Sequence, residues 1–319
     1  MHAPASHSHS HASGHAHAHA HAGHSHAPAN FGRAFAIGTA LNIAFVAVEA
    51  FFGLRAHSTA LLADAGHNLS DVFGLLLAWG AAALASRGPT LRRTYGLRSS
   101  TILAALANAV FLVFAAGAIA WEAIGRFGNP EPVAGGVVAV VAAVGIVVNA
   151  STALLFASGR KNYLNVRGAY LHMAADAGVS AAVLCAGLAI AATGWLWIDP
   201  AVSLLVVIVI LFTTTGLLRD SFNLAVGGVP AHVNPTTVRG FLASLPGVTA
   251  VHDLHIWGMS TSECALTAHV VRPLLEDEDA FLLSTADALR HRFGIGHSTL
   301  QIERGHGVYA CELASDAVV

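Results

Sequence analysis

Two stretches of this sequence place a histidine and an aspartate four residues apart among apolar residues. The first, LLADAGHNLSDVFGLLLAWG, contains His67 and Asp71, and the second, GAYLHMAADAGVSAAVLCAG, contains His172 and Asp176. On a helix, this spacing puts both side chains on one face, one turn apart. Two such helices facing each other would direct two imidazoles and two carboxylates to a common point. This ligand set suits Zn²⁺ and is acceptable to Co²⁺ and other divalent first-row metals.

Each pair also has a simpler interpretation, a hydrogen bond within one helix that only satisfies two buried polar groups. Ionisable groups in a bilayer cost about 2.5–3.5 kcal/mol each on insertion scales, so the recurrence of the pair in a second helix favours a metal site. Two other acids, Asp64 and Glu49, lie in apolar stretches. Asp64 could orient His67, accept a proton or face water, and Glu49 could line an aqueous route to the site.

The composition is typical of a membrane protein. Of 319 residues, 55% are hydrophobic and 11% are charged, whereas soluble domains carry about 25% charged residues. The mean hydropathy is +0.62. The net charge of −2 gives no indication of nucleic-acid binding. Three widely spaced cysteines do not form a disulfide framework.

Six stretches are long enough to cross a bilayer, which takes about 20 apolar residues. They are Phe35–Leu54, Ala60–Ala85, Ser100–Ile124, Val133–Phe156, Gly168–Ala192 and Asp199–Leu218. All six are rich in glycine and alanine, as expected where transmembrane helices pack closely. We therefore expect a six-helix transmembrane domain over residues 31–222, between a tail over residues 1–30 and a domain over residues 228–319.

Basic residues indicate the orientation of a membrane protein, because they are enriched in cytoplasmic segments. With both termini inside, nine of them lie on the cytoplasmic side: Arg33, Arg87, Arg92, Arg93, Arg98, Arg160, Lys161, Arg167 and Arg219. The opposite side has two, Arg55 and Arg126. The sequence predicts a multi-pass protein of the inner (plasma) membrane with both termini in the cytoplasm.

The residues from about Pro230 onward predict the order helix, strand, strand, helix, strand. Asn234 can cap a helix through Ser244, TAVHDLHIWGM and CALTAHVVR alternate as strands, DEDAFLLSTADALRHRF is amphipathic, and STLQIE completes the sheet. This order fits a ferredoxin-like α+β sandwich. The predicted fold class is thus an α-helical membrane protein with six transmembrane helices and a C-terminal cytoplasmic ferredoxin-like domain.

The sequence resembles the cation diffusion facilitator family, specifically its zinc-transporting branch. The resemblance covers about residues 31 to 311 and rests on ALLADAGHNLSD, RRTYGLRSSTILAALAN, LNVRGAYLHMAADAGVS and PGVTAVHDLHIWGMS. It implies a homodimer, formed through the C-terminal domain, that exchanges cytoplasmic Zn²⁺ for protons. By motif position it puts the transport ligands at His67, Asp71, His172 and Asp176, the residues that the spacing selects.

Histidines also occur on the predicted strands of the C-terminal domain. Because strand side chains alternate between faces, His252 and His255 are expected to point in opposite directions, and only one can join His269. The resemblance favours His252 with His269, joined by His297 or Glu303 from the last strand, as a cytoplasmic zinc-sensing site.

A simpler interpretation is that these are surface histidines on a sheet, since their spacing is unlike that of a zinc finger. Cys311, close to His306, could add a thiolate to the site.

The ligand chemistry suggests how such a protein could couple metal to protons. A ligand binds metal only when deprotonated, so protons and metal compete for it, and histidine titrates near neutral pH. Our hypothesis is that the site binds Zn²⁺ from the cytoplasm, and that protonation of His67 or His172 on the more acidic side releases the ion. Co²⁺ and Cd²⁺ are alternative cargoes.

Two other function classes explain parts of the sequence. A membrane-embedded metalloenzyme would need an open coordination position for water, but four protein ligands fill the coordination sphere, and the sequence has no further base or oxyanion motif. A membrane-anchored zinc sensor would leave four costly intramembrane groups unexplained. We therefore predict a transporter and not an enzyme, whose partners are divalent metal ions, protons, the lipid bilayer and a second copy of the chain.

The first 26 residues contain ten of the 20 histidines, as in GHAHAHAHAGHSH. Such a composition cannot bury a core, so the tract is predicted to be disordered. Neutral imidazoles at this density bind Zn²⁺ and similar ions in many interchangeable arrangements. We expect a weak cytoplasmic collector of metal near the entrance; the alternative is a low-complexity tail with no role in transport.

Overall fold

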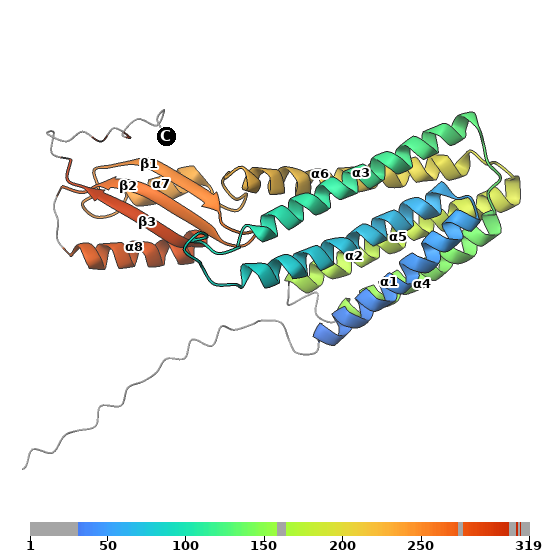
Figure 1. Ribbon diagram of the computed structural model, residues 1–319, viewed down its shortest axis with the longest axis horizontal. Coiled ribbons are helices and arrows are strands. Elements are labelled where there is room, and N and C mark those ends of the chain that lie inside the picture. The colour runs from blue at the N-terminus through green and yellow to red at the C-terminus, as the bar shows by residue number, and fades with distance from the viewer. Residues whose placement is uncertain (1–30, 158–163, 274–276, 306–310, 312, 314–319) are drawn as a thin grey trace, which may run out of the picture.

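The computed structural model describes residues 31–157, 164–273, 277–305, 311 and 313, and leaves out the side chains of residues 31–38, 155–157 and 164–169. The predicted tail over residues 1–30 and His306 lie outside the described residues. The rest of the chain forms a helical domain followed by a small α+β domain (Figure 1).

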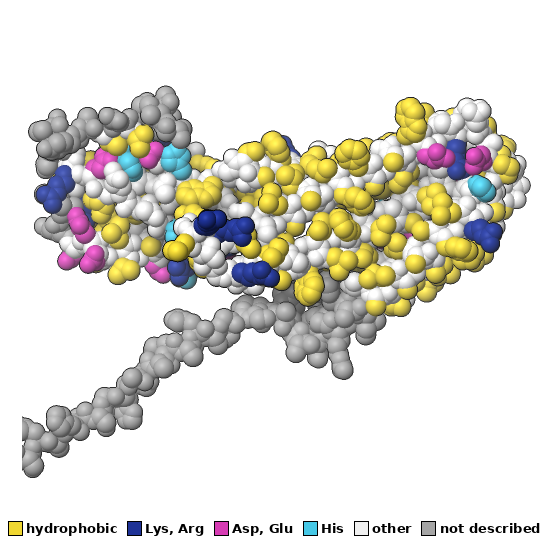
Figure 2. All heavy atoms as spheres, viewed as in Figure 1, with side chains coloured by type: hydrophobic (Ala, Val, Ile, Leu, Met, Phe, Trp, Pro, Cys, Tyr) yellow, Lys and Arg dark blue, Asp and Glu magenta, His cyan; other side chains and the backbone are white. Residues whose placement is uncertain are grey.

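Six long helices form the first domain. They are α1 (Phe31–Arg55), α2 (Thr59–Ala85), α3 (Ser100–Gly128), α4 (Gly135–Ala157), α5 (Leu164–Thr193) and α6 (Ile198–Ala225). Helices α2 to α6 each contain a stretch that is long and apolar enough to cross a membrane, and α1 contains the sixth predicted span. Apolar side chains cover the outside of these helices (Figure 2), so the protein is an integral membrane protein, as predicted.

A buried carboxylate joins the beginnings of α2 and α6. Asp199 accepts hydrogen bonds from the amide and hydroxyl of Thr59, both at 2.7 Å, from the amide of Ala60 at 3.4 Å and from the Ser58 hydroxyl. The Ser58 Oγ in turn accepts from the amide of Leu61, as an N-cap residue does. A carboxylate is favourable at a helix N-terminus, where unpaired amides carry partial positive charge. This contact positions α2, the helix of the first His-Asp pair.

Helices α4 and α5 approach closely through two glycines. A Cβ atom on Gly187 would lie 2.7 Å from the Ala139 amide nitrogen, and one on Gly135 would lie 2.7 Å from the Ala191 amide nitrogen. Because the obstructing atoms belong to the backbone, only glycine fits at these positions. The small-residue packing expected of transmembrane helices is therefore present.

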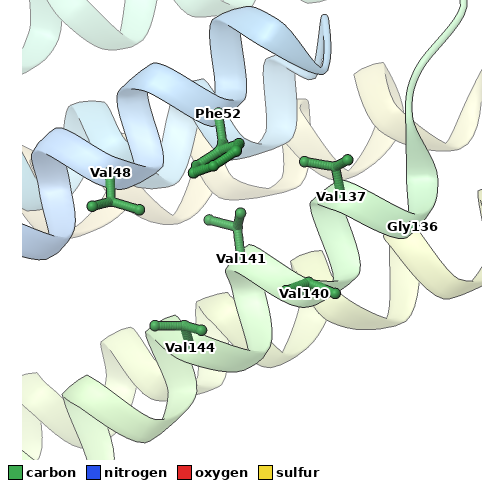
Figure 3. A pocket seen from close by; sticks show the side chains of 7 residues that line it. All are labelled: Val48, Phe52, Gly136, Val137, Val140, Val141 and Val144. Carbon is green, nitrogen blue, oxygen red and sulfur yellow. The ribbon is translucent and has the colours of Figure 1, made fainter.

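The outer surface between α1 and α4 is apolar. A shallow groove there is lined by Val48 and Phe52 of α1 and by Gly136, Val137, Val140, Val141 and Val144 of α4 (Figure 3). These side chains offer no metal ligand or hydrogen-bonding group, so the polar chemistry of the helical domain lies elsewhere.

The C-terminal domain has the predicted order of elements. They are α7 (Pro235–Ala243), β1 (Ala250–Gly258), β2 (Cys264–Val271), α8 (Glu278–Phe293) and β3 (Ile295–Glu303). Asn234 caps α7, accepting from the amides of Thr236 and Thr237. The sheet has the order β1-β2-β3, with β1 antiparallel and β3 parallel to β2. Leu242, Leu266 and Leu289 are fully buried between the sheet and the two helices.

The first turn of α3 contacts the β1–β2 turn of the C-terminal domain. The Arg98 guanidinium lies 2.7 Å from a carboxylate oxygen of Glu263, the Ser99 hydroxyl donates to the Met259 carbonyl, and the Thr261 amide donates to the Thr101 hydroxyl at 3.1 Å. Figure 2 shows basic side chains gathered where the two domains meet. These contacts join the helical domain to the sheet.

Candidate metal sites

The two predicted His-Asp pairs meet between α2 and α5. The Nε2 atom of His67 lies 3.4 Å from Oδ1 of Asp176, and the Nε2 atom of His172 lies 3.2 Å from Oδ2 of Asp71. Within each helix, the corresponding distance is 3.8 Å. Each imidazole therefore contacts both carboxylates, and the contacts between helices are shorter than those within a helix. Two independent intrahelical hydrogen bonds do not describe this arrangement.

The atoms that face one another in this quartet are suited to binding a cation. One ligand atom each of His67, Asp71 and Asp176 lie within 4.8 Å of one another. His172 completes the group and is the most exposed member, with 44% of its side chain accessible, whereas Asp176 is buried. Buried oxygens of Asp71 and Asp176 have no hydrogen-bond partner among the described residues. A divalent cation would satisfy them.

A second group of polar side chains lies beside the quartet. Glu49 of α1 and Asp64 of α2 are both 0% exposed. The amide nitrogen of Asn68 lies 3.3 Å from Oε2 of Glu49 and 3.4 Å from Oδ1 of Asp64. The Ser180 hydroxyl donates to Oδ2 of Asp64 at 2.9 Å. The sequence analysis did not select Asn68 or Ser180, although Ser180 follows the second His-Asp pair by one turn on the same face.

This arrangement excludes two of the expected roles for these acids. Asp64 does not face water and Glu49 does not line an aqueous route in this conformation, because both side chains are fully buried. Nor does Asp64 orient His67 through any hydrogen bond between described side chains, since its oxygens contact Asn68 and Ser180.

A second cluster lies on the face of the sheet that α7 and α8 leave uncovered. Glu303 contacts both histidines of this cluster, at 3.3 Å from Nε2 of His252 and 3.0 Å from Nδ1 of His269. The sulfur of Cys311 lies 3.4 Å from Nδ1 of His269. One ligand atom from each of these four residues lies within 4.8 Å of the others.

A β-bulge changes which histidines share this face. The ladder pairs His252 with His269 and His255 with Thr267, so one extra residue is inserted in β1. Asp253 at the bulge has φ 49°. The expectation that His252 and His255 point to opposite faces is therefore wrong, because strict alternation fails at a bulge. Asp253, which the sequence analysis missed, contacts His255 at 2.8 Å and His269 at 3.4 Å.

His297 does not join the cluster. It lies near the beginning of β3, opposite Ala265, whereas the neighbour of His269 on β3 is Gln301. Four residues of strand separate the two positions by about 13 Å. The His297 ring instead stacks edge-on against Tyr95, 5.5 Å away, in the connection between α2 and α3. Cys311 takes the place that the sequence analysis assigned to His297.

The two described cysteines of this domain differ in their surroundings. Cys264 is buried in the core, and its sulfur donates to the Gly294 carbonyl, so desolvation raises the pKa of this thiol. Partial burial also raises the pKa of the Cys311 thiol, and the nearby carboxylates of Glu303 and Asp253 raise it further. Cys311 is the cysteine that can reach a metal.

Comparison with known families assigns both domains. Residues 35–224 match the family described as the cation efflux transmembrane domain, and residues 230–305 match the cation efflux protein cytoplasmic domain. A solved structure of the metal-bound C-terminal domain of the CzcD transporter from Cupriavidus metallidurans is 33% identical and covers 22% of this chain and 99% of that chain, with a TM-score of 0.21.

Full-length relatives agree with this assignment. The cation efflux system protein CzcD of Alcaligenes sp. is 36% identical over 91% of both chains. The zinc transporter ZitB of Escherichia coli is 38% identical over 86% of this chain and 88% of that protein. The cadmium, cobalt and zinc/H(+)-K(+) antiporter of Bacillus subtilis is 34% identical over 81% and 85%. The chain therefore belongs to the cation efflux family and is a membrane transporter that exports divalent metal cations, not an enzyme.

Proposed function

We propose that the protein exports Zn²⁺ in exchange for protons through the quartet of His67, Asp71, His172 and Asp176. The observation that carries this proposal is the crossed contact between α2 and α5, in which each imidazole meets the carboxylate of the other helix. Two nitrogen and two oxygen ligands form a set that Zn²⁺ accepts in tetrahedral geometry. Because protons compete for the same atoms, binding is tight at neutral pH and weak at acidic pH.

The choice of Zn²⁺ as the main cargo rests on the mixed imidazole and carboxylate ligands. Co²⁺ accepts the same ligands, so discrimination depends on geometry and on availability in the cell. Relatives are named for zinc and for cadmium, cobalt and zinc. Cd²⁺ and Co²⁺ are therefore secondary cargoes in this proposal.

The proposed orientation places both termini in the cytoplasm of a cell with this protein in its inner membrane. It is supported by the excess of arginine and lysine in the segments that this orientation makes cytoplasmic. The C-terminal domain, and with it the cluster of His252, His269, Glu303 and Cys311, then faces the compartment from which metal is removed. We propose that the chain forms a homodimer through this domain and that the cluster binds Zn²⁺ as a cytoplasmic sensor.

Transport by the full-length protein in proteoliposomes tests the proposal. With a metal-sensitive dye inside and an imposed pH gradient, wild-type protein should accumulate Zn²⁺, and Asp176→Ala should reduce the initial rate at least about 100-fold, since a ligand is lost. Asp287→Ala is the matched control. Asp287 forms a His-Asp pair of the same spacing with His291, 3.3 Å apart, but on the surface of α8.

Two results would contradict the proposal. Wild-type rates in Asp176→Ala would show that the quartet is not the transport site. Zn²⁺ uptake that is unchanged when an ionophore collapses the pH gradient would show that protons are not the counter-ion.

A further inference from the structure

The buried acids Glu49 and Asp64 have no role in the metal quartet, yet they lie within a few ångströms of each other. The same Asn68 nitrogen lies 3.3 Å from an oxygen of one and 3.4 Å from an oxygen of the other. The two side chains also hydrogen-bond directly to each other. A hydrogen bond between two carboxyl groups requires a proton on one of them, because a carboxylate has no donor.

The surroundings of the pair provide no cation to neutralise it. Helix α4 has no ionisable residue, and the other charged residues of α1 lie near its ends. The nearest titratable groups are His67 on α2 and Asp176 on α5, both members of the quartet. One Glu49 oxygen, Oε1, is buried and accepts no hydrogen bond from the described residues. Two adjacent anions in such a place are unfavourable, whereas a pair that shares one proton is stable.

We propose that Glu49 and Asp64 form a proton-binding site, separate from the metal ligands, that holds one shared proton when the quartet is empty and releases it when a metal ion binds. This inference rests on the proposed function of the quartet. On metal binding, the carboxyl O–H bond breaks, its electron pair remains on the oxygen, and the proton passes to water. The pair gains one negative charge as the quartet gains two positive charges.

The positions of the residues explain how the two sites communicate. Asp64 lies one turn before His67 on α2, toward the end of the helix that faces away from the cytoplasm in the proposed orientation. Asn68 follows His67 directly, and Ser180 lies one turn after Asp176 on α5. The field of a bound Zn²⁺ therefore acts on the pair over a short, water-poor distance. A proton taken up from the outer side is exchanged for the outgoing metal ion.

Proton release on metal binding tests the inference with full-length protein in detergent. Zn²⁺ is titrated by calorimetry in buffers of different ionisation enthalpy, which gives the number of protons released per ion bound. Glu49→Gln and Asp64→Asn, which keep the side-chain shape, should each release about one proton fewer than wild type. The Zn²⁺ affinity should change by less than about tenfold. Glu122→Gln, at an exposed acid on α3, is the control and should match wild type.

An unchanged proton count in both variants would overturn the inference, as would a complete loss of Zn²⁺ binding in Asp64→Asn, which would make Asp64 a ligand. Infrared difference spectroscopy on wild-type protein adds a test that needs no variant. The carbonyl band of a protonated carboxylic acid should disappear on adding Zn²⁺, and its absence before Zn²⁺ is added would contradict the proposal.

Failure of the quartet assignment is distinguishable from failure of this inference. If the quartet is wrong, Asp176→Ala binds Zn²⁺ with wild-type affinity. If only the proton site is wrong, Asp176→Ala loses binding while Glu49→Gln releases as many protons as wild type.

Discussion

Cys311 shows how a single residue near the end of the chain completes a site that strands alone leave open. The histidines and the carboxylate of the cytoplasmic cluster come from β1, β2 and β3, whereas Cys311 follows the sheet and approaches His269 from outside it. Its raised pKa means that the thiol is mostly protonated at neutral pH. A metal ion must therefore displace a proton to bind the sulfur.

Metal binding to the cytoplasmic cluster should consequently become tighter as the pH rises from 7 toward the raised pKa of this thiol. We expect Cys311→Ser in an Asp176→Ala background, where the transport site is disabled, to weaken Zn²⁺ binding about tenfold and to flatten its pH dependence. Competition with a chromogenic chelator across a pH series measures both effects. Cys185→Ser is the control, because Cys185 lies on α5, away from the cluster. The same pH slope in Cys311→Ser and wild type would remove the thiolate from the site.

At the scale of elements, the quartet depends on how α2 and α5 are held by their neighbours. The Asp199 contact fixes the first turn of α2 against α6. The two glycines fix α5 against α4 at backbone contact distance. Neither contact touches a metal ligand, yet a shift of either helix would separate the two His-Asp pairs.

Gly187→Ala should therefore disturb the site from a distance. The new methyl group meets backbone atoms of α4 that cannot rotate away, so we expect a loss of about 1–3 kcal/mol in the free energy of unfolding and weaker Zn²⁺ binding. Thermal unfolding in detergent and Zn²⁺ calorimetry measure the two effects. Gly178→Ala is the matched control on the same helix, because a Cβ atom there meets nothing within 4 Å. Equal stability of the two variants would refute the role of this contact.

At the scale of the whole molecule, the chain links a membrane site to a cytoplasmic one. The ion pair of Arg98 with Glu263 and the bond of Thr261 to Thr101 attach the sheet to the beginning of α3. Helix α6 ends at Ala225, shortly before the C-terminal domain, and so provides a second connection. In the proposed orientation, the histidine-rich tail shares the cytoplasmic side with this domain.

Deleting residues 2–26 should lower transport only when metal is scarce. A tethered collector raises the local metal concentration without changing the transport step, so we expect the KM for Zn²⁺ to rise roughly threefold, with the maximal rate nearly unchanged. Initial rates in proteoliposomes over a range of buffered Zn²⁺ concentrations measure this. A tail of equal length with every histidine replaced by glutamine should behave like the deletion. Complete loss of transport would mean that the tail is part of the transport machinery.

Much of this architecture could be predicted from local patterns. Long apolar stretches predict helices because an unpaired backbone group in lipid is costly. The predicted spans agree with α2 to within one residue at its beginning, whereas α6 continues seven residues beyond the predicted Leu218 to Ala225. Hydropathy marks the apolar part of a helix, but a helix continues into water when its sequence permits, so the ends were less well predicted than the spans.

What the sequence by itself determined about this protein is the identity of the two His-Asp pairs, because a spacing of four on a helix follows from local geometry. Only the tertiary structure decided which groups meet. It crossed the two pairs, joined Glu49 to Asp64 through Asn68, brought Cys311 in place of His297, and put His255 on the face of His252. The physical reason is that helix packing, a bulge and a chain end act between residues far apart in sequence, where no local periodicity records the contact.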